Sequence, residues 1–411
     1  MWRRRRSSEA PCSPKKFGVP GAEYFAGSHI NRNVTWHDDA HGFVKYLGRC
    51  QALLQRGEYV DDGEFVNVST NYHGWGRYRK DDKAQFTTTH RREGDADWFF
   101  VVGEGKGDVV LNASSEGRTV EVWNPVTVGR AGCPQPAACA DGKTRVELDL
   151  PVGGSCFVVF APDCAGEKSR VERVERVEIG VTNAWNVSFA YHCGISAAPP
   201  APVTMETLRD WTSFGEDGKA ASTELRYFAG TATYSTTIVG NGEWGMGNGE
   251  YILSLGEVPT GLAHVFVNGV DCGVVWCAPW EADVTSALRE GENEIEIRYT
   301  NNWYNRLVGD CFLPAENRVT RSTVHYWSVP RRKPEGQSRW PLLPTIHSGP
   351  SVSDKLQPSG LLGPVRLVVR GKCAATPWLA SETGSGQFNW KWALDFADRT
   401  FCKHETKGEM K

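Results

Sequence analysis

The sequence has few of the features that mark membrane or nucleic-acid-binding proteins. It contains no run of about 18 apolar residues, so no membrane-spanning helix is predicted. Lys and Arg number 46 against 49 Asp and Glu, which gives a net charge of -3. A chain so nearly neutral has no electrostatic basis for binding nucleic acid or an anionic membrane. These absences favour an uncharged partner.

The cysteine pattern indicates no metal site. Twelve cysteines occur without a single C-x-x-C motif, and the closest pairs, Cys272/Cys277 and Cys133/Cys139, lack zinc-site spacing. Cys50 falls on the apolar face of a predicted helix, where a thiol acts as a small hydrophobe. The start, "MWRRRRSSEAPCSPKK", has the basic end of an export signal without an apolar segment after it. No secretion signal is predicted, and the location of the protein stays open.

What the sequence does contain is typical of β-rich structure. Sixteen Trp and 44 Gly stand against four Met, a mixture that favours strands, turns and flat aromatic surfaces. A length of 411 residues predicts two or three domains.

One amphipathic helix of about 16 residues is predicted near the start. Asp38 or Asp39 can cap it, Gly57 can end it, and apolar residues recur at steps of four, three and four: Phe43, Leu47, Cys50 and Leu54. Such a helix cannot bury its apolar stripe alone, because its stability comes from tertiary packing. Three alternatives remain: the helix packs on a β-domain, it packs on another chain, or it has no packing partner.

From about residue 84 the hydrophobic period changes to two. Five segments predict short strands separated by Gly, Asn and Pro turns, and together a compact antiparallel unit: "DWFFVVGEG", "GDVVLNAS", "RTVEVWNP", "TRVELDLP" and "GGSCFVVFAP".

A third, larger β-region runs from about 178 to 370. Asn268-Gly269 between two apolar runs is the strongest short-range hairpin signal. In "NEIEIRY", Ile295, Ile297 and Tyr299 alternate with charged residues, which predicts one buried and one solvated face. Regular strands without helical partners favour a jelly-roll β-sandwich. The Pro- and Ser-rich stretch 313–357 is predicted as a long loop, and 371–411 as a tail.

Eight segments, which span about 17–370, follow one another in an order that resembles glycoside hydrolase family 106, the α-L-rhamnosidases. They are "GAEYFAGSHINRNVTW", "YLGRCQALLQRGEYV", "HRREGDADWFFV", "VEVWNPVT", "RYFAGTATY", "VFVNGVDCGVVWCAPWEADVT", "GENEIEIRYTNNWYNRLVGD" and "PSGLLGPVRL". The later segments also resemble the galactose-binding-like jelly-roll domain of other large glycosidases.

The resemblance implies a catalytic (β/α) barrel followed by β-sandwich domains, inverting hydrolysis of terminal α-L-rhamnose, and a bound calcium. It implies a mainly β chain that begins with a short helical remnant of the barrel. We expect a disordered basic N-terminus at 1–16, the barrel-remnant loop and helix at 17–83, a small β-domain at 84–177, a sugar-binding-like jelly roll at 178–370 and a tail at 371–411. Relatives of this kind are commonly exported.

The departure from the family concerns catalysis. An inverting hydrolase needs two carboxyl groups about 6.5 to 9.5 Å apart, and no such pair can be identified. Asp61, Asp62 and Glu64 follow the helix and Asp95 and Asp97 begin a strand, where we interpret both sets as solvated turn acids. No catalytic residue is therefore assigned, and the barrel strands that present the family's carboxylates are expected to lie upstream of the matching part.

Three functions are compatible with this sequence. The first is the C-terminal part of an α-L-rhamnosidase-like glycoside hydrolase that acts on a rhamnose-containing glycan and lacks its own catalytic carboxylates. The second is a non-catalytic carbohydrate-binding or structural β-sandwich module, alone or paired with a separately encoded catalytic barrel. The third is an inactive truncated gene product.

The candidate sugar-facing residues lie in "GSHINRNVTW": His29, Asn31, Asn33 and Trp36. Amides and an imidazole can donate to and accept from hydroxyl groups, and a Trp face can stack on a pyranose. The alternative is a turn whose Asn side chains bond to their own backbone.

Two further sets of residues are candidates for sugar or metal binding, and each also has a structural interpretation. Asn301, Trp303 and Arg306, directly after a strand, could grip a sugar hydroxyl pair, but Arg306 could instead pair with Asp310. His37 and His41 have the spacing of a metal motif but lack its Glu and its further ligand, so helix capping is the favoured interpretation. No metal ligand is assigned.

Overall fold

The computed structural model describes thirteen parts of the chain: residues 34–63, 65–70, 74–79, 85–127, 130–133, 136–139, 141–162, 176–191, 198–214, 224–240, 249–314, 317–320 and 351–371. The predictions for 1–16 and for nearly all of 371–411 lie outside these ranges. The strands form antiparallel sheets and helices are few, which confirms the mainly β fold class. The chain divides into two compact units, Met1–Gly42 with Glu175–Gly371 and Phe43–Val174 with Lys372–Lys411. We describe each by itself.

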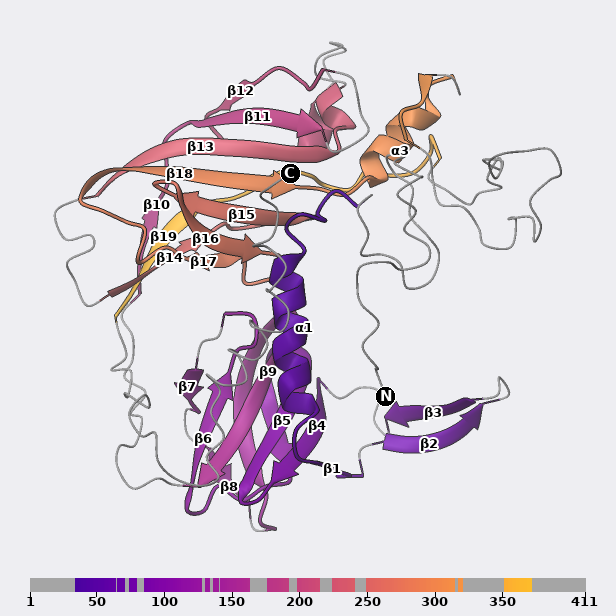
Figure 1. Ribbon diagram of the computed structural model, residues 1–411, viewed down its shortest axis with the longest axis vertical. Coiled ribbons are helices and arrows are strands. Elements are labelled where there is room, and N and C mark those ends of the chain that lie inside the picture. The colour runs from indigo at the N-terminus through magenta and orange to yellow at the C-terminus, as the bar shows by residue number, and fades with distance from the viewer. Residues whose placement is uncertain are drawn as a thin grey trace, which may run out of the picture. The chain divides into compact units, whose positions relative to one another are not determined.

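The unit that begins at Phe43 contains one seven-stranded antiparallel sheet and most of helix α1 (His41–Leu54) (Figure 1). The strand order is β1-β4-β5-β9-β6-β7, with β8 paired to β9. The bounds are β1 (Glu58–Val60), β4 (Phe86–Glu93), β5 (Ala96–Leu111), β6 (Arg118–Trp123), β7 (Arg130–Gly132), β8 (Ala137–Ala138) and β9 (Thr144–Pro162). Strands β2 (Phe65–Thr70) and β3 (Gly74–Arg79) form a separate two-stranded ribbon.

The prediction of five short strands was wrong, because two pairs of predicted strands are continuous. Strand β5 includes both "DWFFVVGEG" and most of "GDVVLNAS", and β9 includes both "TRVELDLP" and "GGSCFVVFAP". The pairing of β5 with β9 shifts register between Gly103 and Gly105, and Gly105 and Gly153 have φ of +76° and +68°. Glycines at these angles form a bulge that bends a strand without ending it.

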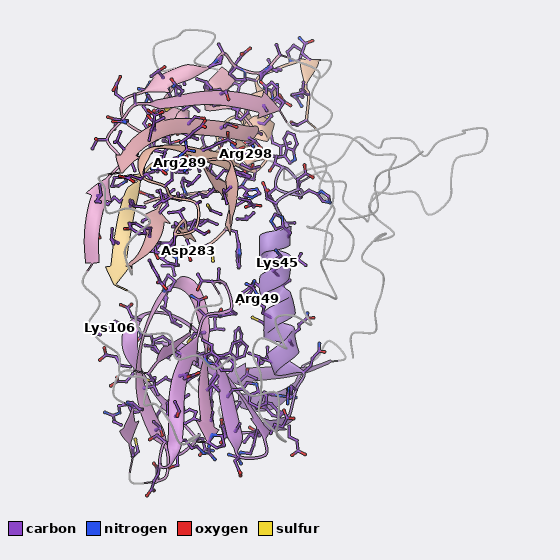
Figure 2. The ribbon with its side chains drawn as sticks, turned by 60° about the vertical axis from the view of Figure 1, so that its left-hand side comes forward. Lys45, Arg49, Lys106, Asp283, Arg289 and Arg298 are labelled. Carbon is purple, nitrogen blue, oxygen red and sulfur yellow. The ribbon has the colours of Figure 1, made fainter. Side chains whose placement is uncertain are left out.

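Helix α1 packs on a face of this sheet, which settles where its apolar stripe is buried. Cys50 and Leu53 contact Trp98, Trp123, Phe157 and Val159 in one cluster. Leu53 is the most buried helical residue at 0% exposed, whereas the predicted Leu54 is only partly buried. Arg49, labelled on α1 in Figure 2, donates to the carbonyls of Pro125 and Val126 at 2.9 Å each. The helix therefore depends on the β-domain for its stability.

The helix ends as the sequence predicts. Gly57 has φ of +64°, the left-handed conformation that glycine adopts readily just after a helix. A Cβ atom at this position would lie 2.4 Å from the carbonyl oxygen of Arg92. The glycine thus permits both the turn and the close approach of strand β4.

The other unit is a β-sandwich of two antiparallel sheets. The six-stranded sheet has the order β12-β11-β13-β18-β15-β16 and the four-stranded sheet β10-β19-β14-β17. Figure 1 shows β11, β13, β18 and β15 side by side. The bounds are β10 (Arg176–Gly180), β11 (Trp185–Tyr191), β12 (Val203–Met205), β13 (Gly230–Gly240), β14 (Gly249–Ser254), β15 (Leu262–Val267), β16 (Val270–Val275), β17 (Glu281–Asp283), β18 (Gly291–Thr300) and β19 (Arg366–Gly371), with η1 (Trp211–Ser213) and α3 (Tyr304–Cys311) outside the sheets.

One hydrophobic core fills the sandwich. Tyr234 and Ile297 of the six-stranded sheet and Leu253 and Leu367 of the four-stranded sheet all belong to it. The predicted alternation along β18 is confirmed, since Ile295, Ile297 and Tyr299 are at most 1% exposed. The predicted hairpin is also confirmed: Asn268 and Gly269, with φ of +53° and +77°, join β15 to β16.

Candidate functional site

The segment 34–40, whose first three residues end the predicted sugar-facing stretch, lies against the β-sandwich. The Thr35 hydroxyl donates to the carbonyl of Asn301, which directly follows β18. Val34 and Ala40 are buried, whereas Trp36 is half-buried. Of the four candidates His29, Asn31, Asn33 and Trp36, only Trp36 is among the described residues. The sugar-facing role of this set stays a prediction.

A histidine on strand β15 joins this segment to the neighbouring hairpin strand. His264 Nδ1 lies 2.9 Å from Asp39 Oδ1, and its Nε2 lies 2.9 Å from Asp271 Oδ1 on β16. The His264 side chain is 13% exposed, and that of Asp39 is 20% exposed. The sequence did not single out His264. Its position on the outer face of an alternating strand gave no sign that Asp39, 225 residues earlier, would meet it.

The two carboxylates determine the charge of His264. Burial of the ring opposes protonation, but the hydrogen bonds to Asp39 and Asp271 outweigh it and raise the pKa of His264 above its ordinary value. The partial burial of Asp271 opposes its ionisation, but the bond from His264 and the backbone N–H of Gly273 lower the pKa of that carboxyl. Asp39, predicted as a possible helix cap, thus directs its carboxylate to His264, and Asp38 pairs with His37.

His37 and His41, whose spacing raised a metal interpretation, have separate surroundings. His37 Nδ1 lies 3.1 Å from Asp38 Oδ1 in an exposed pair, and His41 Nδ1 lies 3.3 Å from the Asp38 carbonyl. The His41 ring meets that of His264 edge-on at 5.8 Å. Within the described ranges, no group of three or more His, Cys, Asp or Glu side chains is arranged to hold a metal ion.

The residues after β18 are engaged inside the sandwich unit. The Asn301 amide donates to the carbonyl of Phe228 at 2.8 Å, and its Oδ1 accepts from Gly230 N at 3.0 Å. Trp303 is 1% exposed. Arg306 Nε lies 3.0 Å from Asp310 Oδ1, one helical turn along α3. These contacts are those of a structural role, and sugar binding by Asn301, Trp303 and Arg306 stays a prediction.

The unit that begins at Phe43 contains a second histidine between two carboxylates. His90 on β4 is fully buried, with Nδ1 3.0 Å from Asp62 Oδ2 and Nε2 2.8 Å from Asp97 Oδ1. Asp97 also accepts from Arg92 at 2.6 Å and from Arg118 at 2.5 Å. The His90 ring stacks on Phe99 with centroids 4.0 Å apart.

The interpretation of Asp97 as a solvated turn acid was wrong, because its side chain is 1% exposed. It has the same parity along β5 as the buried Phe99 and Val101, so the period-two pattern of "DWFFVV" contained the signal. Asp62 is also largely buried, at 13% exposed. Asp61 and Asp95 are exposed, as expected, and Glu64 lies outside the described ranges.

The pairing of charges fixes the ionisation of this cluster. Burial alone would raise the pKa of Asp97, but the bonds from His90, Arg118 and Arg92 lower it to about 2. Burial alone would lower the pKa of His90, but the bonds to Asp62 and Asp97 raise it above its ordinary value. A carboxyl with a pKa of about 2 is ionised at neutral pH and cannot act as a general acid.

In both clusters the imidazole occupies the place between two carboxylates. Inverting glycoside hydrolysis needs one protonated and one ionised carboxyl group with substrate and water between them. In both clusters an oxygen of each carboxylate is instead bonded to a nitrogen of the histidine ring. In each cluster the histidine therefore joins two carboxylates that come from different segments of the chain.

The comparisons with known proteins point to glycoside hydrolases. The chain is similar to a rhamnosidase from Novosphingobium sp. PP1Y, with 26% identity and a TM-score of 0.54 over 78% of this chain. A curated protein of Formosa agariphila, whose name provisionally describes a β-glucuronidase, is 33% identical over 173 residues, or 41% of this chain. A β-glucuronidase from an uncultured Clostridium sp. matches 49% of this chain at 19% identity, but its TM-score of 0.28 supports no argument.

These matches cover only part of the known proteins. The chain spans 25% of the rhamnosidase chain and 14% of the Formosa agariphila protein. No protein-family model matches the chain. The chain is therefore glycoside-hydrolase-like over the part that matches.

Among the helices that the described ranges contain, none is long and apolar enough to cross a membrane.

Proposed function

We propose that this chain forms the C-terminal β-domains of an α-L-rhamnosidase-like glycoside hydrolase of family 106. The similarity to the Novosphingobium rhamnosidase carries this proposal, because it extends over 78% of the chain and combines sequence identity with a shared fold. The glucuronidase-named relative matches 41% of the chain, a smaller share. The order of the eight motif segments supports the same choice.

In this proposal the β-domains support the sugar site and supply no catalytic carboxylate. Asp62, Asp97, Asp39 and Asp271 are bonded to histidine, and the pKa of Asp97 is about 2. The acid and the base then come from a (β/α) barrel, either part of the same protein or separately encoded. Trp36 of segment 34–40 is half-buried, and we propose that the exposed part of its ring stacks on rhamnose.

Calcium, which the family resemblance implies, finds no cluster of three or more carboxylate side chains in the described ranges. Calcium takes six to eight oxygen ligands, and no group of three or more candidate side chains is arranged to hold a metal ion there. The paired carboxylates are engaged by histidine and arginine.

The experiment that tests the proposal is calorimetric titration of the 411-residue chain with L-rhamnose, together with hydrolysis of an aryl α-L-rhamnoside. We expect binding in the millimolar range without turnover. Trp36→Ala should weaken binding about fivefold, because stacking on an aromatic face is worth about 1 kcal/mol, whereas the neighbouring His37→Ala should leave it unchanged. Turnover by the chain alone would contradict the absence of catalytic carboxylates.

A structural module is the second candidate function. It is favoured by the burial of Asn301 and Trp303, which leaves the loop after β18 with internal contacts. Under this alternative the sandwich packs against another domain and binds no sugar. An absence of heat with millimolar L-rhamnose would select it over the proposal above.

A further inference from the structure

The segment 34–42 is fixed to the sandwich unit at three points. The Thr35 hydroxyl donates to the Asn301 carbonyl, and the Asp39 carboxylate meets His264. Gly42 lies so close to β16 that a Cβ atom there would be 3.0 Å from Val274 Cβ. Two of these contacts are insensitive to pH, whereas the contact of Asp39 with His264 joins two titratable groups.

The geometry of His264 determines its protonation state. A neutral imidazole donates from one nitrogen and accepts at the other, whereas an imidazolium donates from both. Both nitrogens of His264 face carboxylate oxygens at 2.9 Å, and a carboxylate oxygen can only accept. Both bonds therefore exist only when the ring carries two protons.

The charged and titratable groups around His264 come from three elements. Asp39 and His41 belong to the docked segment and the start of α1, and Asp271 belongs to β16. On β18, Arg298 (labelled in Figure 2) lies over the Phe266 ring at 4.3 Å and bonds to Glu296 at 2.7 Å. The Phe266 ring packs against His264 with centroids 4.4 Å apart. Two carboxylates thus face His264 directly, and the guanidinium of Arg298 is engaged with Phe266 and Glu296.

We propose that His264 is a positioning residue, which as an imidazolium bridges Asp39 and Asp271 and thereby holds segment 34–42, with Trp36, in place on the β-sandwich. Deprotonation of the ring removes one of the two donors, so one carboxylate loses its partner. The docking of the segment then depends on Thr35 and on packing at Gly42. Only the consequence for sugar binding rests on the proposed function.

The sign of the pH effect follows from the raised pKa of His264. A group whose pKa is higher in the docked state contributes its full stabilisation below its ordinary value of about 6.5. That contribution is lost as the pH rises through the higher, docked value. Segment 34–42 is therefore held most firmly at mildly acidic pH, as long as Asp39 and Asp271 remain ionised.

The test is amide hydrogen exchange of the full chain, without sugar, between about pH 5.5 and 8.5, after correction for the intrinsic pH dependence of exchange. The reporters are the amides of Asp39, Ala40 and Gly42, which are bonded within the turns of this segment. We expect their protection in the wild type to fall as the pH rises. His264→Gln should lower protection about tenfold at acidic pH, because it removes a hydrogen bond between two charged groups, and should remove the pH dependence.

The matched control is His37→Gln, which changes an exposed histidine of the same segment and should leave protection and its pH dependence intact. Asp39→Asn removes one carboxylate charge and should shift the midpoint of the wild-type transition to lower pH, even if His264→Gln fails to fold. Unchanged protection in His264→Gln, an unchanged midpoint in Asp39→Asn, or wild-type protection that is independent of pH would each overturn the proposal.

A second measurement separates this inference from the proposed function. If the chain binds L-rhamnose through Trp36, the affinity should fall with rising pH in parallel with the protection of segment 34–42. If rhamnose does not bind but the protection titrates as expected, the sugar site is wrong and the role of His264 stands. If rhamnose binds with an affinity that is independent of pH while the protection titrates, docking of the segment does not control the site.

Discussion

Replacement of Asp97 by Asn tests the buried charge cluster in the unit that begins at Phe43. The pKa of Asp97 falls from 3.8 to about 2 in the folded protein. One pKa unit corresponds to about 1.4 kcal/mol, so the ionised carboxylate stabilises this unit by about 2 kcal/mol at neutral pH. Asparagine removes the charge that His90, Arg92 and Arg118 face. We therefore expect a loss of about 2 to 4 kcal/mol, since the upper part of this range applies when a buried pair is broken.

The pH dependence of this effect has a defined direction. Because the pKa of Asp97 is lowered on folding, its contribution is fully present above the ordinary value of 3.8 and is lost as the pH falls from there toward about 2. The difference in stability between wild type and Asp97→Asn should therefore be constant from about pH 5 to 6, below the ordinary pKa of His90, and should shrink at lower pH.

The assay is urea unfolding followed by hydrogen exchange of the peptides that contain β4, β5 and β9, so that this unit is measured separately. Asp95→Asn is the matched control, because Asp95 lies two residues away on an exposed turn. We expect the control to stay within about 0.5 kcal/mol of the wild type. If Asp97→Asn unfolds at the same urea concentration as Asp95→Asn, the cluster does not stabilise the unit and the reasoning is refuted.

Two further predictions concern helix α1. Leu53→Ala should destabilise the same unit by about 2 to 5 kcal/mol, because Leu53 is 0% exposed in the core beneath the helix. The partly buried Leu54→Ala should cost less in the same urea experiment, and equal losses would contradict the observed helix face. Gly57→Ala should destabilise by about 1 kcal/mol or more, through its φ of +64° and the contact with the Arg92 carbonyl, whereas Gly94→Ala, with φ of +58° and open space around it, should cost less. Equal losses for the two glycines, measured by thermal unfolding, would refute the close-approach argument.

Local sequence patterns predicted the parts of the fold that local physics determines. The apolar steps from Phe43 gave helix α1, the Asn268-Gly269 pair gave the β15–β16 hairpin, and the alternation at Ile295 and Ile297 gave strand β18. Each of these features depends on the backbone preferences and side-chain directions of a few neighbouring residues.

The features that the sequence concealed depend on long-range contacts. The glycines near residue 105 were interpreted as the end of a strand. Strand β9, however, pairs with β5 on both sides of the register shift between Gly103 and Gly105, so the glycines form a bulge within one continuous strand. Asp97 was interpreted as a turn acid, but the pairing of Arg92 with Asp97 across β4 and β5 places guanidinium beside carboxylate. His264 and Asp39 are separated by 225 residues in the sequence and come into contact only in the folded chain. No pattern within one segment reports such a partner.

The most direct test of the central claim is calorimetric titration of the 411-residue chain with L-rhamnose, repeated with D-glucuronate. Rhamnose is the sugar in the name of the rhamnosidase relative, whereas glucuronate is the sugar in the name of the Formosa agariphila relative. The account predicts saturable heat with L-rhamnose at millimolar concentration, a weaker affinity in Trp36→Ala, and no heat with D-glucuronate. Heat with glucuronate alone, or with neither sugar, would contradict it.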